Sequence, residues 1–186
     1  MPMAHSEQSA AAQREAYLSG TMVLLAAAAV IVAALGFEHI GGYIPCPLCL
    51  QQRYAYYAGI PLTGLALVLL GLGRPQAAAL LLIAVALLFV ANAGIGVYQA
   101  GAEWGLWLGP QSCATAEPLP PDAGSLLKGL AESQLNRCDQ ASWRFLGLSF
   151  AGWNAVMSAL LAVGALRTGY VCDQDDGSKR QSISAS

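Results

Sequence analysis

Four long stretches of this chain carry no charged residue and no histidine, and they limit the fold more than any other feature. A helix needs about 20 apolar residues to cross the hydrocarbon core of a bilayer, and each stretch is long enough. Only 11% of all residues are charged, against about a quarter in a typical soluble domain. The pattern predicts an all-α membrane protein, a bundle of four transmembrane helices. The charge-free stretches are residues 16–37, 54–73, 75–102 and 145–166.

One transmembrane domain, residues 17–168, is expected between polar tails at 1–16 and 169–186. The first apolar run exceeds the roughly 7–15 residues of a signal peptide's apolar region, so we expect it to remain as a helix. The N-terminal tail has no apolar periodicity and is expected to be poorly ordered. A Gly-Leu-Gly-Arg-Pro turn predicts that the second and third helices form an antiparallel hairpin. The expected helices cover about 17–37, 49–72, 76–98 and 148–166.

Counting the crossings places two cysteine-bearing loops, about 38–48 and 101–147, on the same side of the membrane. Both termini and Arg74 then lie on the other side. Five of the nine Lys and Arg residues fall on the side of the termini, a small bias that favours a cytoplasmic location for that side. The sequence therefore predicts cytoplasmic termini, with both cysteine-bearing loops outside the cytoplasm.

The five cysteines follow the same division. Cys46 and Cys49 form a C-P-L-C motif in the first loop. Cys113 and Cys138 lie in the second loop, whereas Cys172 lies on the side of the termini. Such a partition fits an oxidising space outside and a reducing cytosol inside. A C-x-x-C pair closes a reducible disulfide, and one of its thiols is readily held as a thiolate near a helix N-terminus or a cation.

Arg53 lies four residues after Cys49, on the same face of a helix that begins near Cys49. The guanidinium and the helix N-terminus would both favour a Cys49 thiolate. The alternative role for Arg53 is to hold its charge at the membrane surface, as Arg does at many membrane helix ends. This arrangement also places a thiolate beside the bilayer, where a lipid-soluble electron acceptor is available.

The cysteines allow two simpler interpretations. Four of them can form two structural disulfides that hold an outer cap on a four-helix scaffold. A zinc site is the other, but a single C-x-x-C without a second matching pair is poor zinc-ligand spacing, so no metal is expected. With a net charge of −2 and no basic block, the chain predicts no nucleic-acid partner.

Taken together, these segments resemble the DsbB family of bacterial membrane enzymes. Phe37-Glu38-His39, followed by Pro45-Cys46-Pro47-Leu48-Cys49 and Arg53, is similar to the family's first outer loop and its arginine on the quinone side. Cys113 and Cys138 match the cysteine pair of its second loop. The Trp-Arg-Phe-Leu-Gly-Leu segment at 143–148 resembles the segment that leads into the family's last helix. The likeness covers most of the chain, from the first helix through the fourth.

The resemblance implies a protein-disulfide:quinone oxidoreductase that spans the bacterial inner membrane, surrounded by lipid, with its active cysteines on the periplasmic side. It implies that a periplasmic thiol oxidant of the DsbA type attacks Cys113, and that Cys113 and Cys138 pass the electrons on to Cys46 and Cys49. Cys49 would then deliver them to ubiquinone or menaquinone beside Arg53.

One position departs from that family. The third helix ends with Val97-Tyr98-Gln99 and, shortly after, Glu103-Trp104, without the histidine that many relatives carry near this point. The role of that histidine is therefore not carried over, and His39 is interpreted either as functional or as an interfacial polar residue.

A second enzymatic alternative is a vitamin K epoxide reductase-like protein. Its redox C-x-x-C would be expected late in the chain, and here it lies early.

Overall fold

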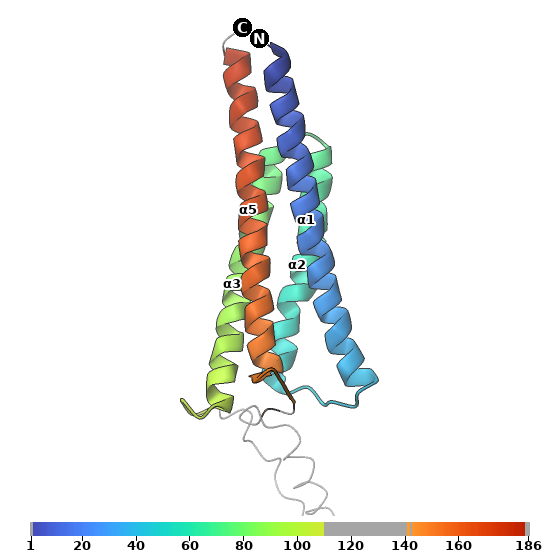
Figure 1. Cartoon of the computed structure of the whole chain (residues 1–186), viewed down its shortest axis with the longest axis vertical. Helices are drawn as coiled ribbons and strands as arrows, with labels where there is room; N and C mark the ends of the chain where they lie inside the picture. Colours follow the sequence, from blue (N-terminus) through green and yellow to red (C-terminus); the bar gives the residue numbers. More distant parts are fainter. Residues whose placement is uncertain (1, 110–140, 142, 185–186) are drawn as a thin grey trace, which may run out of the picture.

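The computed structural model describes residues 2–109, 141 and 143–184. These residues form four long helices that run side by side along the length of the molecule, with both chain ends at the same end of the bundle (Figure 1). Each of the four is long and apolar enough to cross a membrane, which confirms the predicted architecture. The helices are α1 (Pro2–His39), α2 (Pro47–Gly71), α3 (Pro75–Glu103) and α5 (Phe150–Ser184).

Both tails differ from the prediction, because α1 begins at Pro2 and α5 continues to Ser184. The expected poorly ordered N-terminal tail and the polar C-terminal tail are therefore helical. The N-terminal segment is rich in Ala, Gln and Glu, which are good helix formers, and extending an existing helix avoids the cost of nucleating a new one. As a result, α1 and α5 reach well past the turn between α2 and α3 (Figure 1).

The predicted antiparallel hairpin of α2 and α3 is present. Leu72 ends α2, Gly73 takes a left-handed backbone (φ +70°) and Pro75 occupies the first turn of α3. Glycine is the residue that enters this conformation without strain, and proline fits a helix start because its missing N–H has no helical partner there. The hairpin sets α2 and α3 side by side, so that polar residues on both can meet inside the bundle.

A short β-hairpin precedes the last helix; its first strand lies in the predicted loop, and its second lies where the sequence predicted that the helix begins. Strand β1 (Arg144–Phe145) pairs antiparallel with β2 (Leu148–Ser149). Leu146 and Gly147 between them both have positive φ angles, 52° and 82°, as a two-residue hairpin turn requires. The Ser149 hydroxyl accepts the Gly152 N–H, so this serine caps the start of α5 and ends the strand.

The interior is built largely from small residues that let the helices approach closely. Gly59 of α2 lies under the Phe89 ring, and Gly96 of α3 lies against the backbone of α5 at Ala151. Such contacts suit a membrane bundle, in which lipid tails are as apolar as the side chains and association depends on close packing. The cluster of buried apolar residues midway along the bundle includes Val23, Ala27, Ile31, Ala55, Tyr56, Val85, Ala86, Phe89, Leu161, Ala162 and Ala165.

Candidate active site

The cysteine pair, Cys46 and Cys49, lies at the start of α2, at the end of the bundle away from the chain termini. Cys46 caps the helix with an extended backbone, and Pro47 occupies its first turn. The Cys46 sulfur accepts the Cys49 N–H at 3.2 Å. The two sulfurs are 2.7 Å apart, so a small rotation of either side chain brings them to disulfide geometry. The C-P-L-C motif therefore places two neighbouring thiols at a helix N-terminus, and their redox role stays a prediction.

Cys46 is the buried member of the pair, with 7% of its surface exposed. The hydrogen bond between its thiol and the Cys49 sulfur, together with burial, raises the pKa of Cys46. Cys46 therefore keeps its proton, and the Cys49 sulfur is the acceptor within the pair. This asymmetry agrees with the assignment of Cys49 as the nucleophilic sulfur.

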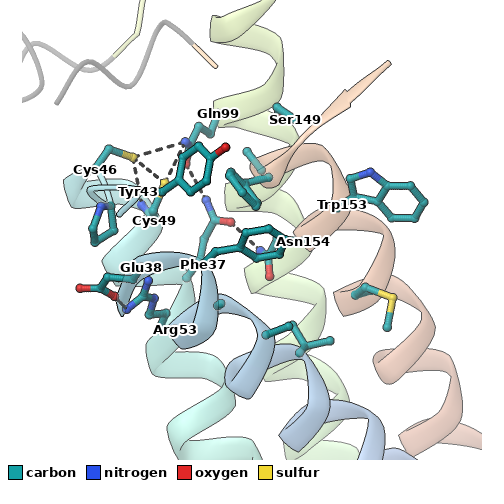
Figure 2. A pocket seen from close by; sticks show the side chains of 18 of the residues that line it. Phe37, Glu38, Tyr43, Cys46, Cys49, Arg53, Gln99, Ser149, Trp153 and Asn154 are labelled. Atoms are coloured by element: carbon teal, nitrogen blue, oxygen red, sulfur yellow. Dashed lines mark hydrogen bonds and ion pairs between the residues drawn. The ribbon is translucent and has the colours of Figure 1, made fainter. Parts of the chain in front are cut away.

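Gln99 of α3 is the polar side chain that contacts both sulfurs, and no role was predicted for it. Its Nε2 lies 3.4 Å from the Cys46 sulfur and 3.3 Å from the Cys49 sulfur (Figure 2). Its Oε1 accepts a hydrogen bond of 2.7 Å from Gln52 of α2. Only 2% of Gln99 is exposed. The signal that points to it is an amide inside a long apolar stretch, since a polar residue in a membrane helix is costly and usually functional.

Arg53 lines the same cavity as the cysteine pair, one turn farther along α2 than Cys49. Its guanidinium forms an ion pair with the Glu38 carboxylate of α1 (Figure 2). The structure thus gives Arg53 a carboxylate partner, while the donor to the sulfurs is Gln99. His39, which follows Glu38, is an exposed residue at the end of α1.

A cavity of about 260 Å³ lies beside the cysteine pair, lined by residues of all four helices and of the chain before α2. Part of its wall is aromatic. Phe37 of α1 packs against Phe150 of α5 with ring centroids 5.1 Å apart, and Tyr43 contacts the same Phe150 ring at 5.8 Å. Besides Phe37, α1 contributes aliphatic side chains to the wall, including Val30 and Ile31. The site therefore offers an apolar chamber with redox-capable sulfurs on its surface.

Buried amides and hydroxyls continue from Gln99 into the bundle, and we call this set the amide seam. Asn154 of α5 donates to the Gln52 Oε1 at 2.6 Å and accepts from the Tyr56 hydroxyl at 2.7 Å. Farther along, Asn92 of α3 donates to the Ser158 hydroxyl at 2.9 Å. These bonds join α2, α3 and α5, and the bond from Gln52 is the one that holds Gln99 in place beneath the sulfurs. The seam consists of Gln52, Tyr56, Asn92, Gln99, Asn154 and Ser158.

Glu103 ends α3 one turn beyond Gln99 and also lines the cavity. Its Oε1 lies 3.3 Å from the Gln99 Nε2, whereas its buried Oε2 has no hydrogen-bond partner among the residues that the structure describes. Arg144 of β1 donates to the backbone carbonyl of Glu103 at 3.3 Å. Sequence reasoning missed this carboxyl, because only the fold brings the end of α3 beside the cysteine pair.

Of the remaining predicted site residues, Cys113 and Cys138 lie outside the described part of the chain, so their pairing stays a prediction. Cys172 is fully buried near the opposite end of the bundle, in a cluster with Leu70 and Leu82. This position agrees with its expected separation from Cys46 and Cys49.

The comparisons with known proteins agree on one family. The family model described as "Disulfide bond formation protein DsbB" matches residues 17–167. The protein called "Disulfide bond formation protein B" from Marinobacter nauticus is 34% identical, over 76% of this chain and 84% of its own. Its namesakes from Aromatoleum aromaticum and Methylococcus capsulatus are 33% and 35% identical, over 74% of this chain and 85% and 83% of theirs. No solved structure matches significantly. A redox-capable C-x-x-C at the start of a membrane helix and a match over most of the chain lead to one conclusion, that this protein belongs to the DsbB family of disulfide bond formation proteins.

Proposed function

We propose that this protein is a disulfide oxidase that takes electrons from a DsbA-type thiol partner and transfers them to a membrane quinone. The observation that carries the proposal is the position of the cysteine pair, whose sulfurs are 2.7 Å apart on the wall of an apolar cavity between membrane-spanning helices. A dithiol in such a place meets lipid-soluble molecules more readily than solutes in water.

The residues around the cavity fit a quinone ring. Its volume of about 260 Å³ is close to the lower end of small-molecule sites, about 300 Å³. Phe37, Tyr43 and Phe150 would pack against the flat ring, and Arg53 would donate hydrogen bonds to a ring oxygen, even while it pairs with Glu38. A bound quinone supplies an acceptor for two electrons and two protons. Ubiquinone and menaquinone share this chemistry.

The second cysteine pair completes the proposed relay. Cys113 receives the attack of the partner's thiolate, and Cys138 resolves the resulting mixed disulfide and exchanges with the pair on α2. A DsbA-type oxidant has a potential of about −120 mV, so thiol buffers near −200 mV cannot keep it oxidised. A quinone pool coupled to respiration can. We therefore also propose that the protein lies in the bacterial inner membrane, with the cysteine pair on the periplasmic side.

The test is quinone reduction by purified protein that is given a reduced DsbA-type protein and a short-chain ubiquinone. We expect turnover in the wild type, none in Cys49→Ser, and unchanged turnover in Cys172→Ser, because Cys172 lies far from the cavity. Cys138→Ser should accumulate a Cys113-linked adduct with the partner on a non-reducing gel, since the resolving thiol is missing. Absence of both turnover and adduct would favour a scaffold with structural disulfides.

A further inference from the structure

We propose that Glu103 is the proton acceptor for the cysteine pair, linked to both sulfurs through the Gln99 amide. The inference rests on the proposed function, in which Cys46 and Cys49 are oxidised beside the cavity. It concerns a carboxyl group that the electron relay described above does not use.

The Gln99 amide nitrogen has fewer hydrogens than it has acceptors around it. The Gln99 Nε2 lies 3.4 Å from the Cys46 sulfur, 3.3 Å from the Cys49 sulfur and 3.3 Å from the Glu103 Oε1. A side-chain amide nitrogen carries two hydrogens, so it cannot serve three acceptors at once. The arrangement is satisfied when a proton resides on one of the three groups. Gln99 therefore couples the protonation of the two thiols to that of the carboxyl.

The Glu103 carboxyl has one buried oxygen that lacks a hydrogen-bond donor in the described structure. Its Oε2 is buried beside the cavity and makes no hydrogen bond within the described structure, although the Ser149 hydroxyl interacts with the carboxyl. A buried carboxylate oxygen without a donor is costly, and it is relieved when the oxygen binds a proton. Oε2 is thus the atom at which an incoming proton is held.

Neither of the two described arginines around the cavity forms an ion pair with the Glu103 carboxylate, so that carboxylate can accept a proton. Arg53, across the cavity, is paired with Glu38. On the near side, Arg144 of β1 contacts the Glu103 backbone and exerts a favourable charge interaction on its carboxyl. Among the residues that the structure describes, Cys49 also has a charge interaction with Glu103. The ionised form of Glu103 is thereby supported by an exposed arginine, and the protonated form by burial.

The redox step balances with this assignment. When Cys46 and Cys49 join in a disulfide, two S–H bonds break, one S–S bond forms, and two electrons and two protons leave. Glu103 takes the proton of Cys49 at Oε2, and the proton of Cys46 is released as the S–S bond closes. Both electrons go to the quinone acceptor, which also takes up two protons to form the hydroquinone. Glu103 returns its proton to the cavity and is ready for the next cycle.

The experiment compares wild type with Glu103→Gln, which keeps the shape of the side chain but cannot accept a proton. Protein reduced and held without quinone is treated with iodoacetamide from pH 5 to 9, and the rate at Cys49 is followed by peptide mass spectrometry. Loss of a neighbouring negative charge favours the thiolate, so we expect the midpoint to fall by about one pH unit. Quinone turnover should fall at least about tenfold, as expected for loss of a general base.

These opposite signs separate the proposal from a structural role. Faster alkylation of Cys49 at pH 6 with slower turnover supports it. An unchanged alkylation profile overturns it, and so does a shifted profile with wild-type turnover, which would mean charge coupling without proton transfer. Glu103→Asp retains a carboxyl and should recover part of the turnover, which guards against a simple folding defect. Glu15→Gln, the same chemical change near the opposite end of the bundle, is the control. Because alkylation needs no quinone, failure of the proposed function would not affect it.

Discussion

Replacing Gln99 with leucine removes both hydrogen bonds that the amide directs at the Cys46 and Cys49 sulfurs. A hydrogen bond to a charged group contributes about 1.5–3 kcal/mol, and a thiolate accepts it more strongly than a disulfide sulfur does. The reduced pair therefore loses more stabilisation than the oxidised pair. Since about 1.4 kcal/mol corresponds to about 30 mV for a two-electron couple, Gln99→Leu should lower the reduction potential of the pair by about 30–65 mV.

The same substitution leaves the Gln52 Nε2 without its acceptor, which should cost about 1–3 kcal/mol of folding free energy. Asn92→Leu is the matched control. Asn92 is a buried amide on the same helix whose donor serves Ser158, so its loss should destabilise the bundle similarly without touching the sulfurs. We expect the control to change the melting temperature and leave the potential unchanged.

The assay uses a Cys113→Ser, Cys138→Ser background, so that only the pair on α2 titrates in the redox range. Protein is equilibrated against dithiothreitol buffers of graded potential, and the reduced fraction is read from the mass added by alkylation. The reasoning about Gln99 is refuted if Gln99→Leu shifts the potential by less than about 10 mV, or shifts it to more positive values.

Two further predictions concern the cavity and the membrane. Arg53→Ala should raise the quinone concentration needed for half-maximal rate by about ten- to a hundredfold, because a contact worth about 1.5–3 kcal/mol is lost. Arg74→Ala at the α2–α3 turn is the control. An unchanged quinone dependence in Arg53→Ala would mean that Arg53 only anchors the helix at the membrane surface. Reporter fusions at Arg74 and within Pro118–Pro121 should report opposite sides of the membrane, and a shared location would contradict the four-helix topology.

The number of helices was predictable because a bilayer enforces a simple rule, that a spanning helix excludes charge. The start of α2 was predicted at about Cys49, and the helix begins slightly earlier, at Pro47, because proline fits a first helical turn. The helical tails were not, because the apolar pattern marks the span of a membrane helix and gives no sign of how far it continues into water.

The β-hairpin was missed because two-residue strands leave too little alternation to detect, and only Gly147 hinted at a turn. Gln99 and Glu103 were missed for another reason. They lie about 50 residues from the cysteine pair along the chain, and their role depends on the face of α3 that turns toward α2, which spacing within one helix cannot reveal.

The amide seam also determines which helix can move most easily to open the cavity to the bilayer. It joins α2, α3 and α5 to one another. In the described structure, the side-chain bonds from α1 to the other helices lie between Gln13 and Ser19, as in Ser19–Thr168, and at Glu38, which pairs with Arg53. Between them, α1 is held by apolar packing, which lipid tails replace at little cost. The gap through which a hydrophobic molecule moves between the bilayer and the sulfurs should therefore open along α1. The speed of that exchange should follow the thickness and lateral pressure of the surrounding lipid.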